Sequence, residues 1–229
     1  MKRNILIIAA HPDDDILGCG GLIAKYRKSV NFKVIFIAEG SSCRYKNLSA
    51  NKDQIDQTIK KRNCYAKNAL KLLGVKNFSF YDLPCGRLDS LPIIEINKII
   101  ENEINLFKPE ILFTHSESDN NNDHRIIFRS SLMAARPGVV KNLKTILSYE
   151  VLSSTEWNFS ESFAPNHFEL LNLNQINLKW KALKCYESET GVYPHPRSEE
   201  GIHALARYRG IQAGFKYAEA FKIIRNFKK

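Results

Sequence analysis

The chain has 229 residues, of which 44% are hydrophobic, as expected for a globular protein with one substantial core rather than a disordered chain. Its net charge is +10, but Lys and Arg are spread along the sequence without a nucleic-acid-binding motif. We therefore expect no nucleic-acid partner, and a basic surface compatible with a phosphorylated or nucleotide-linked substrate.

The sequence contains no apolar stretch long enough to span a bilayer, and the first apolar run is too short for a signal-peptide core. Its five cysteines are irregularly spaced and include no CxxC pair. These features predict reduced thiols and a cytoplasmic protein without a transmembrane segment.

Strand-like and helix-like segments alternate along the chain. Strands are expected over 5–10, 32–38, 78–83, 111–114 and 145–152. Helices are expected over 16–27, 54–73, 93–107, 125–135, 174–186 and 199–221. The alternation predicts an α/β fold: a Rossmann-like, doubly wound, mainly parallel sheet with helices on both faces, in a single domain over 1–229.

Two polar clusters follow the first and fourth predicted strands. His11 and three consecutive aspartates, 13–15, follow the first, and the polar segment 115–125 follows the fourth. The carboxyl ends of parallel strands form ligand sites, and adjacent carboxylates repel one another unless a cation offsets them. His11, one of the aspartates and His124 would supply the three protein ligands of a catalytic zinc ion.

The two clusters resemble those of the LmbE/PIG-L-like family of zinc-dependent deacetylases, which act on N-acetylglucosamine-type sugars. The matching motifs are AHPDDD at 10–15 and NNDHR at 121–125, with further similarity in LPCGRLDS at 83–90, YEVLSSTEW at 149–157 and YPHPRS at 193–198. The resemblance covers nearly the whole chain.

The resemblance implies a role for each residue of the two main motifs. His11, Asp14 and His124 would bind zinc, although Fe²⁺, Mn²⁺ or Co²⁺ also suits these ligands. Asp13 would be the general base. Apart from the resemblance, we expect Asp123 to orient a ligand without binding the metal, and Asp15 to be either a carboxylate at the helix N-terminus or one that orients a ligand.

One position departs from the family pattern. Many members carry a histidine where this chain has Asn121, and that histidine is thought to polarise the carbonyl or protonate the leaving amine. An asparagine can donate a hydrogen bond to an oxyanion but cannot act as a general acid. Asp13, His115 or His195 would supply the proton instead, and we favour His195 because it lies between two prolines beside Arg197.

Four residues are candidates for binding the substrate. Arg44 would contact a phosphate or a hydroxyl, or lie on the solvated surface. Trp157 would stack on a sugar ring, or be an ordinary buried tryptophan. Arg136 would reach the pocket, or only stabilise the end of its helix. Arg197 is the fourth candidate, next to His195.

These features predict an N-deacetylase of an amino sugar, a small-molecule substrate, and by family resemblance a homo-oligomer. One alternative is a metal-dependent sugar-binding module that has lost turnover, with Asn121 as the trace of that loss. The presence of Asp13 argues against it, because a binding module needs no base. Another alternative is a hydrolase of a different amide, such as a thiol-conjugated glycoside.

Overall fold

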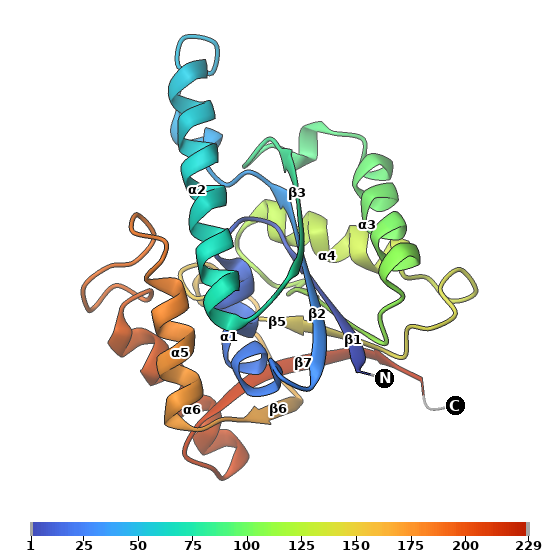
Figure 1. Ribbon diagram of the computed structural model, residues 1–229, viewed down its shortest axis with the longest axis vertical. Helices are drawn as coiled ribbons and strands as arrows, with labels where there is room; N and C mark the ends of the chain where they lie inside the picture. Colours follow the sequence, from blue (N-terminus) through green and yellow to red (C-terminus); the bar gives the residue numbers. More distant parts are fainter. Residues whose placement is uncertain (1, 228–229) are drawn as a thin grey trace.

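The computed structural model describes residues 2–227, which form a seven-stranded sheet between two layers of helices (Figure 1). The strands are β1 (Arg3–Ala9), β2 (Val30–Ala38), β3 (Asn77–Leu83), β4 (Ile111–His115), β5 (Thr145–Tyr149), β6 (His167–Leu170) and β7 (Ala218–Asn226). The helices are α1 (Asp14–Tyr26), α2 (Lys52–Leu73), α3 (Ile93–Phe107), α4 (Asn122–Ala134), α5 (Leu173–Leu183) and α6 (Glu199–Ala213).

The order of the strands confirms the predicted doubly wound, mainly parallel sheet. The strands lie in the order β3-β2-β1-β4-β5-β7-β6, and the first five along this order are parallel. The chain winds outward from β1 to β3 and then returns to place β4 on the other side of β1. The crevice beyond the carboxyl ends of β1 and β4 is therefore the switch point, where open α/β sheets bind ligands.

The C-terminal part of the sheet differs from the sequence prediction. The predicted helix over 199–221 is wrong over its last third, 214–221, because α6 ends at Ala213 and Gly214 adopts a left-handed conformation with φ of 75°. The chain then forms β7, which pairs antiparallel with both β5 and β6. The short strand β6 was not predicted, since it lies in a segment without regular alternation.

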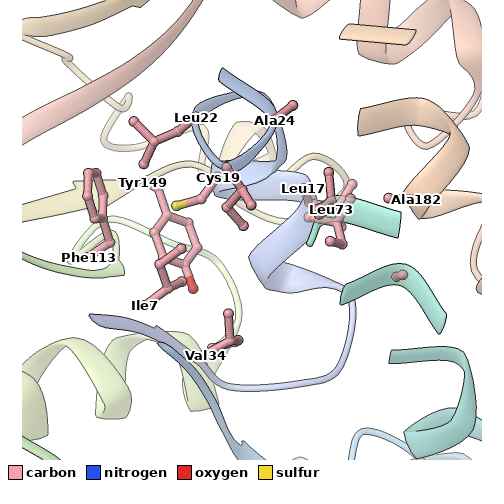
Figure 2. Close-up of a cluster of buried hydrophobic side chains, with 14 of the residues drawn as sticks. Ile7, Leu17, Cys19, Leu22, Ala24, Val34, Leu73, Phe113, Tyr149 and Ala182 are labelled. Atoms are coloured by element: carbon pink, nitrogen blue, oxygen red, sulfur yellow. The ribbon is translucent and has the colours of Figure 1, made fainter. Parts of the chain in front are cut away.

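The hydrophobic core has two parts, one on each face of the sheet. Helices α1, α2, α5 and α6 contribute to one part, and α3 and α4 cover the other face (Figure 1). Tyr149 at the end of β5 is fully buried near Ile7, Cys19 and Phe113 (Figure 2). A Cβ atom at Gly18 would lie only 2.1 Å from the Tyr149 ring, so this glycine lets α1 pack closely on β5.

Within residues 2–227, no helix is both long and apolar enough to cross a membrane.

Candidate metal centre and active site

Three side chains from the two predicted clusters converge at the switch point. His11 follows β1, Asp14 begins α1, and His124 lies in the first turn of α4. His11 Nδ1 lies 3.4 Å from Asp14 Oδ2, His124 Nε2 lies 3.3 Å from the same oxygen, and the two ring nitrogens are 3.4 Å apart. In a tetrahedron with zinc–ligand bonds of about 2.0–2.1 Å, two ligand atoms lie about 3.3–3.4 Å apart. The three atoms thus suit a tetrahedral divalent metal with one open position.

A carboxylate lies behind each of the two histidines. His11 Nε2 lies 3.0 Å from Asp123 Oδ2, and His124 Nδ1 lies 3.1 Å from Asp119 Oδ2. Histidines that bind metals commonly donate their other ring N–H to a carboxylate, which fixes the tautomer and the ring orientation. His11 Nε2 is hydrogen-bonded to Asp123, which leaves Nδ1 of the neutral ring free to bind a metal. Asp119 lies at ion-pair distance from His124 Nδ1, and its charge favours the proton on that nitrogen. This arrangement supports the metal assignment independently of the ligand spacing.

Hydrogen bonds hold the carboxylates of Asp123 and Asp119 in place. Asp123 accepts hydrogen bonds from the backbone N–H groups of Gly86 and Leu88, at 2.6 and 3.3 Å. Asp119 accepts from the Thr155 hydroxyl at 2.5 Å and from the Ser154 hydroxyl. The turn after β3 and the loop after β5 therefore orient the two histidines indirectly.

The contacts within the triad raise the pKa of His11 and lower the pKa of Asp14. Burial tends to lower the pKa of His11, but hydrogen bonds to Asp123 and Asp14 outweigh it and raise the pKa to about 9. Burial opposes ionisation of Asp14, yet the neighbouring His124 and His11 hold the pKa of this carboxyl well below its usual range. A negative charge is thus stabilised where a cation would bind.

Asp13, the expected base, adjoins this triad and has an unusual backbone conformation. Its φ of 117° lies in the left-handed region, which is uncommon for a residue with a side chain and occurs at functional sites. Its Oδ2 accepts hydrogen bonds from Arg62 at 3.0 Å and from Arg197 at 2.8 Å. Burial raises the pKa of Asp13, while the two positive charges act in the opposite direction. The two arginines therefore fix the orientation of the Asp13 carboxyl group and favour its ionised form.

The same arginines also contact Glu189. Arg62 donates to Glu189 Oε1 at 2.7 Å, and Arg197 lies 3.4 Å from Oε2. Arg44 donates to both oxygens of Glu189, at 2.7 and 2.9 Å. We call these five residues the arginine cluster: Arg44, Arg62, Arg197, Asp13 and Glu189. Its three cations and two carboxylates leave an excess of positive charge beside the triad when all are ionised.

A hollow of ≈ 270 Å³ opens beside the arginine cluster. Trp157 and His195 line it together with Arg197 and Glu189. Trp157 is 46% exposed, so the structure contradicts the alternative of an ordinary buried tryptophan. His195 is exposed, and its Nδ1 accepts a hydrogen bond from the Arg197 backbone N–H at 3.1 Å. This contact places the proton of the neutral ring on Nε2.

Asn121 and His115, the other residues considered for the reaction, have different contacts. Asn121 caps α4, where its side-chain oxygen accepts the Asp123 backbone N–H at 2.9 Å. His115 is fully buried, and its Nε2 accepts the backbone N–H of Ala10 at 2.8 Å. Burial and the neighbouring His124 lower the pKa of His115 to about 3. A neutral, enclosed His115 is a poor proton donor near neutral pH.

Two of the expected site residues, Arg136 and Asp15, form no hydrogen bond or ion pair with the triad or the arginine cluster. Arg136 follows the far end of α4, about 15 Å of helix from the triad, where it donates to the Met133 carbonyl and lies 4.0 Å from Glu101. Asp15 is fully buried, and within residues 2–227 its carboxyl oxygens have no hydrogen-bond partner. Burial and the charge of Asp13 raise the pKa of Asp15 to about 8. Asp15 therefore contacts neither histidine, and its carboxyl is largely protonated at neutral pH.

Sequence reasoning missed Arg62, Glu189 and Asp119. Arg62 lies in the basic run Lys60-Lys61-Arg62, which looks like a solvated helix face, yet its side chain is buried. Glu189 lies in an irregular segment that carries no motif. Asp119 belongs to the polar segment after β4, where its position four residues after His115 offered no basis for preferring it over its neighbours.

The fold is shared with solved structures of different activity. One is the N,N'-diacetylchitobiose deacetylase from Pyrococcus horikoshii, with a TM-score of 0.77 and 19% identity over 97% of this chain and 84% of the other. Another is GalB, the 4-carboxy-2-hydroxymuconate hydratase from Pseudomonas putida, with a TM-score of 0.75 and 19% identity over 99% and 98%. At these identities the likeness shows the fold alone, and the reaction must be argued from the site.

The sequence comparisons are more specific. Residues 6–135 match the family model described as PIG-L, GlcNAc-PI de-N-acetylase, which is more than half of the chain. The Escherichia coli protein YaiS, described as an uncharacterized deacetylase, is 30% identical over 193 residues, covering 82% of this chain and 92% of YaiS. Together with the metal-binding arrangement described above, these matches show that the chain belongs to the PIG-L (LmbE-like) family of deacetylases.

Proposed function

We propose that this chain is a zinc-dependent hydrolase that removes the N-acetyl group from an amino sugar of the N-acetylglucosamine type. The observation that carries the proposal is the tetrahedral spacing of His11 Nδ1, Asp14 Oδ2 and His124 Nε2 beside Asp13. Membership of a de-N-acetylase family supports the amide bond as the target. The diacetylchitobiose deacetylase with the same fold supports a sugar as the carrier of that amide.

The triad residues would hold the metal, and Asp13 would handle protons. Zinc bound to the triad would supply Lewis acidity, which polarises the amide carbonyl and lowers the pKa of water. Both arginines contact Oδ2 of Asp13, which leaves Oδ1 to take a proton from the attacking water. The arginines keep the carboxylate in this orientation throughout the reaction.

The leaving amine requires a proton, and His195 is our candidate donor. It shares the hollow with Arg197, which also contacts Asp13. His195 would act as the acid in its protonated imidazolium form and would donate from Nε2, the ring nitrogen that does not contact the Arg197 backbone. Asp13 could instead return the proton that it took from water. A His195→Gln variant separates these routes: we expect its kcat to fall about 100-fold with unchanged metal content. Unchanged turnover would assign both transfers to Asp13.

The arginine cluster favours a substrate with an anionic group near the sugar. Arg44 is half-exposed, and Glu189 is contacted by three guanidinium groups at once. A phosphate or nucleotide substituent could therefore displace Glu189 as a partner of Arg44. Arg44 would therefore favour a phosphorylated substrate over a neutral one, while the reaction itself would be the same.

Acetate release tests the function directly. Purified protein loaded with zinc would be incubated with N-acetyl amino sugars, both free and linked to phosphate or nucleotide, and with an amide of a thiol-conjugated glycoside. An Asp13→Asn variant serves as the control, since it removes the base but retains the triad. We expect release that falls about 10²–10⁴-fold in the variant while its metal content remains at one ion per chain.

Other outcomes distinguish the alternatives. Turnover of the thiol-conjugated amide alone would retain the mechanism and change the substrate class. Sugar binding without turnover by any member of the panel would favour the binding module. Full activity of Asp13→Asn would contradict the assignment of the base.

A further inference from the structure

Two cysteines from different loops meet beside the metal centre. Cys43 lies in the short helical turn Ser42–Arg44 that follows β2, and Cys85 lies in the turn that follows β3. Their sulfur atoms are 3.2 Å apart, and both cysteines are unbonded thiols. A disulfide requires about 2.05 Å, so the sulfurs need to approach by about 1.2 Å. The pair is close to bonding geometry without being bonded.

The two thiols differ in exposure and reactivity. Cys43 is exposed and reachable from solvent, whereas Cys85 is buried. The Cys85 thiol donates toward Cys43 Sγ, and this contact lowers the pKa of Cys43 to about 6. An exposed thiolate attacks a disulfide, and a buried neighbour can then resolve the mixed disulfide. The pair therefore has the arrangement of an attacking and a resolving cysteine.

The turn that carries Cys85 also supports a metal ligand. The backbone N–H of Gly86, the next residue, donates to Asp123 Oδ2, which lies 3.0 Å from His11 Nε2. The Cys85 sulfur, an Asp123 oxygen and a His11 ring nitrogen all lie within 4.8 Å of one another. A Cβ atom at Gly86 would lie 3.0 Å from the Cys43 Cβ, so the two loops are in close contact. A shift of this turn would therefore move the Asp123 carboxylate, which in turn contacts His11.

We propose that Cys43 and Cys85 form a modification site, where a low-molecular-weight disulfide oxidises the pair to an intramolecular disulfide that weakens metal binding. The Cys43 thiolate attacks one sulfur of the reagent, forming a mixed disulfide and releasing the first thiolate. Cys85 then loses its proton to solvent, and its sulfur attacks Cys43 Sγ and releases the second thiolate. The protein loses two protons and two electrons, and the reagent is reduced to two thiols.

The effect on the metal follows from the shift of the turn. Drawing Cys85 toward Cys43 displaces Gly86, whose N–H holds Asp123 against His11. Loss of an outer partner of a metal-binding histidine typically lowers metal affinity about 10–100-fold. This second step rests on the metal site of the proposed function, whereas formation of the disulfide does not.

The bond itself is tested on the full-length protein with oxidised and reduced glutathione, alkylation of the remaining thiols and mass spectrometry. We expect the number of free thiols to fall by two of the five, with one peptide linking Cys43 and Cys85. Cys43→Ser and Cys85→Ser should abolish the link. Cys64→Ser, which changes an exposed cysteine on α2, should retain it. A persistent glutathione adduct on Cys43, or unreactive thiols, would overturn the proposal.

The coupling is tested by zinc competition with a chelator in both redox states. We expect about 10-fold weaker zinc binding after oxidation, recovery on reduction, and no redox response in Cys43→Ser. A disulfide that leaves zinc affinity unchanged would overturn the coupling. A redox-dependent zinc affinity in a protein that deacetylates no member of the substrate panel would support this inference while contradicting the proposed function.

Discussion

The metal triad and the rim of the hollow beside the arginine cluster are built in different ways. The triad, with Asp119 and Asp123 behind it, is buried and anchored at the ends of β1 and β4 and the starts of α1 and α4. The rim comes from irregular segments after β5 and before α6, and its residues Trp157 and His195 are exposed. Regular elements hold side chains precisely, whereas loops accept changes of sequence. The comparison indicates that the regular elements set the metal site, whereas the rim supplies exposed side chains, the proposed proton donor His195 among them, that can change without disturbing the triad.

The largest effect should come from removing a triad residue. Asp14→Ala should lower the metal content from about one ion per chain to none and abolish acetate release, exceeding the ~10–100-fold effect of changing an outer partner. Metal analysis after gel filtration measures this loss. The matched control is Asp15→Asn, because Asp15 is buried beside Asp14 but contacts no ligand. Equal metal loss in both variants would show that the triad is misassigned.

The arginine cluster links the two regions, and its members should differ in their contribution to stability. Arg62→Met leaves Asp13 and Glu189 buried without their most enclosed partner, so we expect a loss of about 3–5 kcal/mol in the free energy of unfolding. Arg44→Met should cost less than about 1 kcal/mol, because this half-exposed arginine is screened by solvent. Urea denaturation compares the two variants, and similar losses would contradict the buried position of Arg62.

The carboxylates behind the histidines should have an intermediate effect. Asp123→Asn removes the negative charge beside His11 and should weaken metal binding about 10–100-fold without unfolding the protein. Competition with a chelator provides the affinity, and Asp56→Asn, an exposed change on α2, is the control. Unaltered affinity in Asp123→Asn would mean that the His11–Asp123 contact does not support the metal.

The smallest effect should come from Trp157, the aromatic residue of the rim. Trp157→Leu removes an aromatic face from the hollow, so we expect KM to rise a few-fold with kcat and metal content nearly constant, in line with ~1–3 kcal/mol or less for one apolar contact. Phe159→Leu is a suitable comparison, because Phe159 is 92% exposed and does not line the hollow. A fall in kcat without a change in KM would place Trp157 in the chemistry instead.

The C-terminal region shows where local sequence patterns were insufficient. The residues Ala218-Glu219-Ala220 favour a helix, but they begin β7 because this segment pairs with β5 and β6 at the same time. Glu219 also accepts hydrogen bonds from the backbone N–H groups of Gly21 and Leu22 in α1. Such distant partners cannot be inferred from the helix propensity of the segment itself.

Apolar periodicity and turn residues act locally, and they were enough to predict the alternating elements through β5, the parallel sheet, and the two polar clusters after the first and fourth strands. The packing of distant segments sets which carboxylate lies beside each histidine, and it brings Arg62, Arg197 and Glu189 together around Asp13. It also brought Cys43 to Cys85 and left Arg136 at the far end of α4. These relations join residues up to 184 positions apart, and packing rather than local pattern sets them.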